Sequence, residues 1–368
     1  SIYKAEELFK NVADKNHPME TVLTIIQGKG TLPREQAGRN IHYDDASLAN
    51  YKKVEQGDFI IHLRSFEGGL EMANEDGIVS PAYTILRCKK PHSSLFYEAY
   101  FHTDEFINHI LSKSVEGIRD GRQISYEAFK WLGLPYCDVS EQERIAQLFC
   151  TLSHRIEKQQ QMVDALKKYK RGVVAAIFSH QLKFSDATGN PYPEWTSCTL
   201  QDAVDFLDGQ RKPLESADRA KRQGQYPYYG ASGIIDYIDD FIFDEPLLLL
   251  GEDGANILNR STPLCFIAEG KYWVNNHAHV MRPKAGQNIK FLCELLESLD
   301  YTRYNTGTAQ PKLNQDKCRR IGLALPVYEE QCHIADFLSA FDQRTDKAQS
   351  ILDYLLSNRD GLLQQLFI

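Results

Sequence analysis

The sequence predicts an α+β protein in which two similar mixed α/β domains are separated by two long antiparallel helices. Three observations predict this fold: an ungapped internal repeat, a heptad pattern of apolar residues in each copy, and opposite charge on the two copies. The helices are expected to form an intramolecular coiled coil that relates the two halves by a pseudo-two-fold axis. A chain of 368 residues is long enough for two or three domains.

The repeat has an offset of 189 residues and opens on the same dipeptide, Glu141-Gln142 and Glu330-Gln331. Further matched pairs are Ile145/Ile334, Ala146/Ala335, Arg155/Arg344, Lys158/Lys347, Leu166/Leu355, Gly172/Gly361 and Phe178/Phe367. Upstream, Gly133-Leu134 matches Gly322-Leu323. Matches of this number at one offset indicate that a whole structural unit is duplicated.

Each copy contains a helix with apolar residues in alternating steps of four and three. The predicted seam consists of Ile145, Phe149, Leu152, Ile156, Val163 and Leu166 in the first helix, and Ile334, Leu338, Phe341, Leu352 and Leu355 in the second. A sustained period of 3.5 residues is typical of a coiled coil. The alternative is that each helix is amphipathic and packs only on its own domain.

Charge and register favour pairing of the two helices with each other. Residues 141–180 carry seven Lys or Arg and four Asp or Glu, a net charge of +3, whereas residues 329–368 carry three and seven, a net charge of −4. Opposite charges favour this pairing over self-association. A parallel pair in register would bring Lys170 against Arg359, which is unfavourable, so an antiparallel pair is predicted.

The repeat also divides the chain into four segments. A first mixed α/β domain is expected at 1–140 and a first spacer helix at 141–180. A second domain with its entry linker follows at 181–328, and a second spacer helix at 329–368. Short β-rich runs bounded by Gly and Pro, such as residues 58–64 and 83–88, predict strands, and residues 95–114 and 291–298 predict helices.

Composition and charge exclude several classes of function. A formal net charge of −8 argues against a nonspecific binder of polyanions, which would carry a positive excess. The charged first twenty residues do not resemble a signal segment, so a cytoplasmic protein is expected. The eight cysteines form no CxxC pair, so they are expected to be reduced, and no metal site is predicted.

Motifs for chemistry are missing from the sequence. There is no GxxxxGK loop followed by Ser or Thr, and no Asn-Pro-Pro-aromatic tetrad. The segment Gly251-Glu-Asp-Gly254 has turn glycines without a following Lys. His277 and His279 share one face of a predicted strand, and a metal pair there stays open beside a packing role. No catalytic residue is predicted.

Polar and cationic side chains beside Gly-rich turns are the remaining candidates, and they favour DNA. Arg reads guanine, Asn and Gln read adenine, and Ser, Thr, Lys and Tyr hold phosphates. The candidates in the first half are Lys29, Arg34, Arg39, Arg64, Ser65, Arg119, Arg122 and Gln123. Those in the second half are Arg211, Lys212, Tyr228, Tyr229, Ser232, Asn256, Arg260, Asn275, Asn276, His277, Thr306, Thr308, Gln310 and Lys312.

These features together resemble the specificity (S) subunit of type I restriction-modification systems. The resemblance rests on the two Glu-Gln openings of the helices, on Gly224-Gln-Tyr-Pro-Tyr-Tyr-Gly230 and on Asn305-Thr-Gly-Thr-Ala-Gln-Pro311. It implies two target-recognition domains that read a split, asymmetric site in double-stranded DNA, without catalysis by this chain. It also implies two modification (methyltransferase) subunits and restriction subunits as partners, and these would bind S-adenosylmethionine, ATP and Mg.

Two other classes of function remain as alternatives. The first is a self-contained DNA methyltransferase or nuclease with fused recognition domains, for which the sequence lacks the motifs. The second is a coiled-coil scaffold without DNA function. A DNA reader is expected to lose affinity steeply as salt rises, whereas a scaffold is not. A helix of about 35 residues spans about 50 Å, so the reader is expected to leave the middle of its target unread.

Overall fold

The fold was analysed in a computed structural model, which describes residues 1–37, 45–61, 69–115, 124–307 and 310–367. The chain divides into two compact units. Unit 1 contains residues Ser1–Met162 and Ala348–Ile368, and unit 2 contains Val163–Lys347. Both units mix helices and strands, which confirms the α+β class. None of the helices in the described part of the chain is long and apolar enough to cross a membrane.

Unit 1 begins with short strands and ends on the two long helices. Its strands are β1 (Ile2–Lys4), β2 (Phe9–Val12), β3 (Leu23–Ile26), β4 (Gly30–Pro33), β5 (Lys52–Val54), β6 (Phe59–Ile61), β7 (Glu71–Met72), β8 (Gly77–Val79), β9 (Thr84–Cys88) and β10 (Gly133–Pro135). Its helices are α1 (Ala5–Leu8), η1 (Arg34–Gln36), η2 (Asp45–Asn50), α2 (Ser94–Phe101), η4 (Glu105–Ile110), η5 (Leu111–Ser114), α3 (Tyr126–Phe129) and the first part of α4 (Val139–Phe178).

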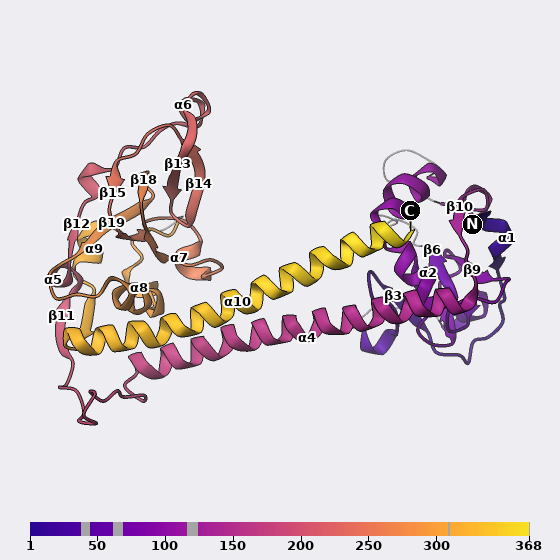
Figure 1. Cartoon of the computed structure of the whole chain (residues 1–368), viewed down its shortest axis with the longest axis horizontal. Coiled ribbons are helices and arrows are strands. Elements are labelled where there is room, and N and C mark those ends of the chain that lie inside the picture. The colour runs from indigo at the N-terminus through magenta and orange to yellow at the C-terminus, as the bar shows by residue number, and fades with distance from the viewer. Residues whose placement is uncertain (38–44, 62–68, 116–123, 308–309, 368) are drawn as a thin grey trace. The chain divides into compact units, whose positions relative to one another are not determined.

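The core of unit 1 lies between an antiparallel sheet and the helices. The sheet has the order β2-β9-β6-β7, and Phe9 and Phe59 point from it toward Tyr97 and Phe101 of α2, with ring centroids 4.9–6.4 Å apart. Phe367, near the end of α10 (Tyr328–Phe367), joins the same cluster. Edge-to-face aromatic pairs of this kind add to the hydrophobic gain of burial. The end of the chain therefore completes the core of the first half (Figure 1).

Unit 2 contains as many strands as unit 1 among the described residues. They are β11 (Thr196–Thr199), β12 (Val204–Phe206), β13 (Gln223–Gly230), β14 (Gly233–Ile238), β15 (Phe243–Asp244), β16 (Leu247–Gly251), β17 (Cys265–Ala268), β18 (Lys271–Val274), β19 (Ala278–Pro283) and β20 (Gly322–Leu325). The helices are α5 (Leu200–Ala203), η7 (Asp208–Gln210), α6 (Ser216–Lys221), α7 (Asn256–Asn259), α8 (Ile289–Ser298), η8 (Thr302–Tyr304), α9 (Gln315–Arg319) and the first part of α10.

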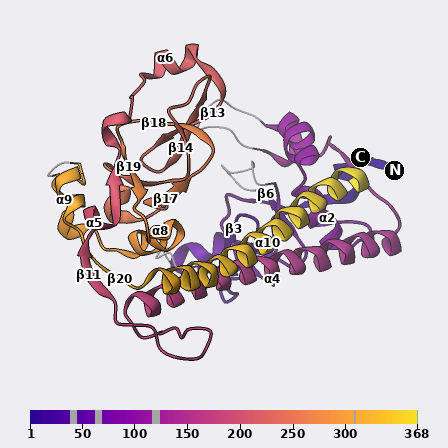
Figure 2. The same cartoon turned by 60° about the vertical axis from the view of Figure 1, so that its left-hand side comes forward.

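Two four-stranded sheets form the centre of unit 2, with orders β12-β19-β16-β17 and β14-β13-β18-β15. Strand β16 is Leu-rich and buried on both faces, as the sequence of a central strand predicts. Helix α8 places Phe291 and Leu295 in a core shared with Ile334 and Leu338 of α10. It thus lies between the first sheet and the long helices of this unit (Figure 2).

The first sheets of the two units have the same register as well as the same order. In unit 1, Phe9 of β2 lies opposite Cys88 of β9, and in unit 2, Val204 of β12 lies opposite Pro283 of β19. Both partners in unit 2 follow their counterparts by 195 residues. The duplication therefore extends upstream of the helices, with an offset six residues larger than the 189 seen in the sequence.

Within each unit the helix segments run antiparallel, which confirms that prediction. In unit 1, Phe149 stacks on Phe367 at 6.0 Å, while Gln159 donates from Nε2 to the carbonyl of Ala348 at 2.7 Å. In unit 2, the Tyr169 ring lies 5.5 Å from that of Phe341. Along each pair, residue numbers thus rise in one helix while they fall in its partner.

The seam residues lie inside this pairing and not on the surface. All of the following are buried or half-buried: Ile145, Phe149, Leu152, Ile156, Val163, Leu166, Ile334, Leu338, Phe341, Leu352 and Leu355. Each seam cation has partners within its own unit. In unit 2, Lys170 binds Asp342 at 2.7 Å and also Glu294, and in unit 1, Arg359 binds Asp360 at 2.9 Å.

The predicted helix over residues 95–114 is wrong in its extent. Helix α2 ends at Phe101, and a π-helical turn (η4) and a 3-10 turn (η5) follow. The buried Thr103 hydroxyl donates to the carbonyl of Tyr100 at 2.7 Å and accepts the amide of Phe106 at 3.1 Å. A side chain that bonds the backbone in this way offers it an alternative to the helix.

Candidate nucleic-acid interface

Four loops of unit 2 meet where β16 ends and β19 begins. They are residues 230–232, 251–254 and 275–277, together with the described residues 305–307 and 310–312. The Glu252 amide donates to the carbonyl of His277 at 2.8 Å, and the Leu313 amide donates to the carbonyl of Glu252 at 2.7 Å. The Gly254 amide donates to Pro311 at 3.0 Å. Backbone bonds thus tie segments far apart in the sequence into one surface.

Gly251 brings the turn between β13 and β14 against this group. A Cβ atom at Gly251 would lie 2.7 Å from the carbonyl oxygen of Ala231, so only glycine permits this approach. The Asn275 amide also donates to the carbonyl of Tyr229 at 3.0 Å. The first glycine of the Gly-Glu-Asp-Gly segment therefore permits a close backbone contact and does not indicate a phosphate-binding loop.

Several predicted DNA-binding residues lie exposed on these four loops. They are Ser232, Asn276, His277, Thr306, Gln310 and Lys312. Two of them also contact acids, because His277 Nδ1 lies 2.8 Å from Asp253 and Lys312 Nζ lies 3.3 Å from Glu252. The set offers hydrogen-bond donors and acceptors with one cation, which is the mixture that base edges and phosphates require. Lys212 is also exposed, and it precedes these loops in the sequence.

Two arginines predicted to bind DNA form ion pairs within unit 2. Arg211 donates from Nη1 to Glu252 Oε2 at 2.8 Å and to the carbonyl of Ala278 at 2.7 Å. Arg260 binds Glu297 Oε1 at 2.7 Å. A guanidinium committed to such charge-assisted bonds has fewer donors for a base. These contacts support the loops and do not face outward.

Four other candidates of unit 2 also serve its structure. Tyr228 is fully buried and its hydroxyl accepts the Leu214 amide at 2.9 Å. Tyr229 is half-buried against Tyr272, at 5.6 Å. The side-chain amide groups of Asn256 and Asn275 form hydrogen bonds with backbone groups a few residues away in the sequence. In this conformation their side chains shape the surface on which the exposed candidates lie.

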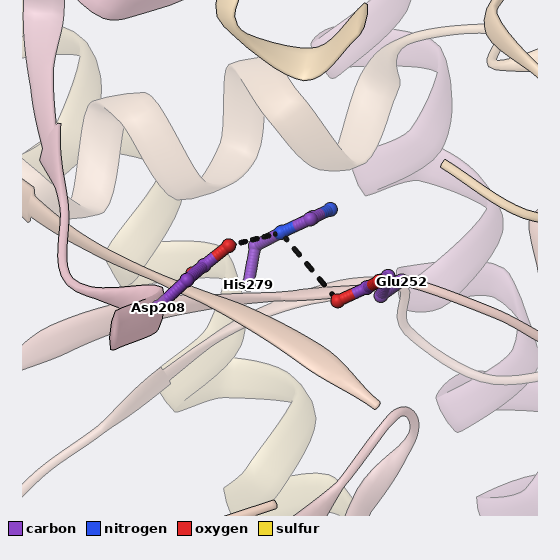
Figure 3. A group of neighbouring side chains, drawn as sticks. All are labelled: Asp208, Glu252 and His279. Carbon is purple, nitrogen blue, oxygen red and sulfur yellow. Dashed lines mark hydrogen bonds and ion pairs between the residues drawn. The ribbon is translucent and has the colours of Figure 1, made fainter. Parts of the chain in front are cut away.

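A buried ionic network lies behind the four loops (Figure 3). His279 is 1% exposed; its Nδ1 lies 2.7 Å from Asp208 Oδ2 and its Nε2 lies 2.7 Å from the carbonyl oxygen of Leu313. Glu252 Oε2 is 3.8 Å from Nδ1. Both ring nitrogens face oxygen acceptors, so the doubly protonated ring satisfies both.

This environment sets the charge of His279. Burial lowers the pKa of His279, but the hydrogen bond to the Asp208 carboxylate, the neighbouring Cys318 and the charge of Asp208 outweigh burial and raise the pKa to about 10. The pKa of Asp208 is lowered: burial raises it, and the hydrogen bond and charge of His279 outweigh that effect. An imidazolium ion therefore pairs with carboxylate at neutral pH.

The same three side chains meet the distance condition for a metal site, because their ligand atoms lie within 4.8 Å of one another. Each of these atoms already has a partner, since Asp208 Oδ2 also accepts Gln315 Nε2 at 2.7 Å and Glu252 accepts Arg211. A metal would have to displace these donors and the ring proton. His277 does not pair with His279, since His277 is exposed and bonds to Asp253.

Unit 1 supports its candidate Lys29 in a different way. The exposed Lys29 lies on the turn between β3 and β4, beside Gly28 and Gly30. The buried carboxylate of Glu71 accepts the Gly28 amide at 2.7 Å and the Gly30 amide at 3.0 Å. His102 Nε2 lies 3.5 Å from Glu71. Burial lowers the pKa of His102, but the hydrogen bonds to the Glu71 carboxylate and to the Glu98 carbonyl, with the charges of both acids, outweigh burial and raise it.

The remaining candidates of unit 1 are mostly outside the described residues. Arg34 is half-buried in η1, directly after β4. The candidates that lie outside the described residues are Arg39, Arg64, Ser65, Arg119, Arg122 and Gln123, together with Thr308 of unit 2. Their assignment to DNA stays a prediction, as it does for every candidate above.

Sequence reasoning missed the acids that hold the loops. Asp208 follows β12, Glu252 lies in the Gly-rich turn, and Glu71 lies in β7. The signal in the sequence was weak: Glu71 stands between the apolar Leu70 and Met72, where an unpaired carboxylate is costly, whereas Asp208 and Glu252 each stand beside a glycine. That signal indicates a partner but does not identify it.

The glutamines of the two Glu-Gln motifs join the long helices to the rest of each unit. Gln142 Oε1 accepts the Ser93 amide at 3.0 Å, directly before α2. Gln331 Oε1 accepts the Asn288 amide at 2.9 Å, directly before α8. Gln331 also donates from Nε2 to the carbonyl of Pro326 at 3.0 Å. Both glutamines are buried, so the repeated dipeptide has a repeated structural role.

Comparison with known proteins agrees with this architecture. Residues 192–355 match the family described as Type I restriction modification DNA specificity domain. This part of the chain is therefore similar to the specificity family, and the resemblance found in the sequence is confirmed. The match covers unit 2 from its linker into α10.

Two curated proteins are similar in sequence to part of the chain. A putative type I restriction enzyme specificity subunit from Haemophilus influenzae is 32% identical over 155 residues, or 42% of this chain and 38% of that protein. The EcoprrI specificity subunit of Escherichia coli is 28% identical over 154 residues, or 42% of this chain and 37% of that protein. The matched part is thus less than half of either relative.

Solved structures match over a much larger part of the chain. A type I restriction-modification S subunit from M. genitalium has a TM-score of 0.63 at 16% identity and covers 100% of this chain and 96% of its own. A chain from a type I R-M system, reported for complex assembly and conformational transition, has a TM-score of 0.59 at 12% identity, with 99% and 96% covered. These likenesses show the fold.

Proposed function

We propose that this chain is a non-catalytic subunit that reads a bipartite, asymmetric sequence in double-stranded DNA. The observation that carries the proposal is a duplicated scaffold with different loops: the same sheet register occurs in both units, whereas Glu71 supports one candidate surface and His279 the other. Two different readers on one scaffold suit two different half-sites.

The chemistry of the exposed loops supports DNA as the ligand. Asn276, Gln310 and Thr306 offer neutral donors and acceptors, and Lys312 offers a cation. Phosphate contacts from such cations make affinity fall as salt rises, and base contacts give specificity. The net charge of −8 leaves room for basic partners to complete the DNA surface.

We further propose that two modification subunits, which bind S-adenosylmethionine, dock on this chain, and that restriction subunits with ATP and Mg join them. The chain itself binds none of these cofactors in this proposal. Support comes from the specificity-domain match at residues 192–355 and from the S-subunit fold of the solved neighbours. The protein is proposed to act in the cytoplasm.

An exchange of residues 190–328 for the corresponding domain of a relative tests the proposal. Methylome sequencing of cells that carry the chain with its modification subunits should show one half of the target changed and the other half retained. The unexchanged chain is the control. Methyl transfer by the purified chain alone would contradict the proposal, and so would salt-insensitive assembly with partners but without DNA binding.

Helix length offers a second test. Helices α4 and α10 have 40 residues each. One extra heptad in each helix, at 162/163 and at 347/348, keeps the seam in phase and adds about 10 Å, or about three base pairs of DNA. The unread gap should grow by that amount while both half-sites stay the same. An unchanged gap would show that the helices do not set the spacing.

A further inference from the structure

The linker before β11 forms a small pocket against the first turn of α10, within unit 2. The cavity has a volume of about 70 Å³. Its wall consists of His180, Leu182, Lys183, Phe184, Pro191, Tyr192, Pro193, Glu194, Trp195 and Glu330. Several cavity waters or one small organic group fit in such a volume.

Glu330 is the unusual member of this wall. Its side chain is 4% exposed, and its Oε2 has no hydrogen-bond partner among the described residues. Burial raises the pKa of Glu330. A hydrogen bond with the Trp195 side chain and the charges of His180 and His333 lower it, but they do not outweigh burial. Its place in the first turn of α10 favours negative charge but supplies no bond to Oε2. A buried carboxylate oxygen left unpaired is costly, which indicates a missing partner.

Aromatic rings provide the other part of the pocket. Trp195 packs against His180 with ring centroids 4.7 Å apart, and Phe184 packs against His333 at 5.0 Å. Tyr192 lies beside the same histidine, at 6.4 Å. Faces of Trp, Tyr and Phe attract cations, so the rings and Glu330 select the same charge.

The cation already in the wall does not satisfy Glu330. Lys183 Nζ lies 3.7 Å from Glu194 at the rim, and these side chains are 68% and 95% exposed. Glu141, at the same repeat position in unit 1, is exposed. The need for a cation is therefore a property of the Glu330 pocket, and not of the Glu-Gln motif.

We propose that this pocket binds an alkylammonium or guanidinium group, with Glu330 as the anionic partner and with Tyr192 and Trp195 as aromatic walls. Such a group is the head of a lysine or arginine side chain, and it also occurs in free amines. The proposal does not depend on the DNA-reading function.

The indole NMR signal of Trp195 provides a direct test on the full chain. The chain has three tryptophans, and Trp131, which is 59% exposed, serves as an internal reference. Methylammonium and guanidinium, added in the low millimolar range, should shift the Trp195 signal saturably, while sodium chloride at equal ionic strength should not. A response to sodium equal to that of methylammonium would overturn the proposal.

Three variants make the test specific. Glu330→Gln should weaken binding of both probes at least tenfold, and Tyr192→Leu should weaken it several-fold, whereas the matched Glu141→Gln should bind as the unmodified chain does. Wild-type affinity in a folded Glu330→Gln protein would refute the assignment. If that variant does not fold, Tyr192→Leu and the wild-type titration still decide.

Side-chain models then distinguish the two sources of the group. N-acetyl-lysine methylamide and N-acetyl-arginine methylamide are titrated beside methylammonium. Tighter binding of either amide indicates that the pocket receives a basic side chain of a protein partner. Equal or tighter binding of methylammonium indicates a free amine. Failure of all four cations to bind would reject the site.

Discussion

Units 1 and 2 share a scaffold but differ in what that scaffold supports. The sheet β2-β9-β6-β7 and the sheet β12-β19-β16-β17 have equivalent order, and buried glutamines join both units to a long helix. Unit 2 adds a second four-stranded sheet, whereas unit 1 has the two-stranded pairs β3-β4 and β5-β8. Both units are thus joined to the long helices in the same way, whereas the candidate DNA contacts lie on loops that differ between the units.

The supporting networks show the same division. In unit 1, Glu71 holds one turn through two backbone amides. In unit 2, Asp208 and His279 form a buried ion pair that reaches Leu313 in another loop. The buried residues that support the candidate DNA-binding surface thus differ between the two units, as the exposed residues on that surface do. Each half can therefore change its surface residues without changing its contacts to the long helices.

The largest expected effect comes from removing one partner of the ion pair in unit 2. Asp208→Asn leaves the imidazolium of His279, which is 1% exposed, without its nearer counter-charge, because the remaining Glu252 carboxylate lies 3.8 Å away. Loss of one partner of a buried pair costs about 3–5 kcal/mol. Urea unfolding with a probe in each unit should show the loss in unit 2 only.

A matched control for this variant is His277→Ala, because His277 pairs with Asp253 at the surface, with 51% of its side chain exposed. Its free energy of unfolding should change little. An equal loss in both variants would show that burial does not distinguish the two histidine–aspartate pairs.

The pH dependence of unit 2 should differ from that of a His279→Gln variant. The folded pKa of His279 is raised to about 10, above an unfolded value of about 6.5. Its stabilisation is therefore complete below the unfolded pKa and is lost as pH rises toward the folded one. The free energy of unfolding should fall by up to about 1.4 kcal/mol per pH unit in this window.

Calorimetry or urea titration of both proteins from pH 6 to pH 10 measures this slope. The variant should show a flatter profile, since titration of other groups is common to both. Parallel profiles would mean that His279 is neutral in the folded protein.

The two helix-joining glutamines provide a symmetric prediction. Gln142→Ala and Gln331→Ala each leave buried backbone groups without a partner, at a cost of about 1–3 kcal/mol. Each variant should destabilise its own unit, by similar amounts, in urea unfolding. A large effect in one unit alone would show that the repeated motif has diverged in its role.

The smallest expected effects concern the seam cations. Lys170→Met removes contacts to Glu294 and Asp342; because Asp342 is 48% exposed, a loss of only about 1–2 kcal/mol is expected. Arg359→Met is the matched control: Arg359 forms its ion pair with the neighbouring, 61% exposed Asp360, so a change near zero is expected. Equal losses in thermal unfolding would indicate that both positions carry equal electrostatic weight.

Much of the helical framework could be predicted from the sequence, because a heptad seam and net charge are local patterns. Ile145 and Ile334 identify the seam by spacing alone, and the antiparallel direction followed from Lys170 and Arg359. The second register of the repeat, at 195 residues, was not visible, because it lies in pairing between strands of different sequence.

The candidate surface was predicted only in part. Exposed residues such as Gln310 and Lys312 stand in Gly-rich loops that the sequence marks as turns. Arg211 and Tyr228 have the same residue types as DNA contacts but lie inside. Burial depends on which segments meet, and the partners of Arg211 come from positions 41 and 67 residues away, which no local pattern shows.

The division of the chain also orders its assembly on the ribosome. Every residue of unit 2 has been made once Lys347 is added, but unit 1 still lacks Ala348–Ile368. Phe367, from that last segment, fills the aromatic core beside Phe96 and Tyr100, at 5.2 and 5.3 Å. Since domains of large proteins fold as units, the half that is translated first is expected to finish folding last.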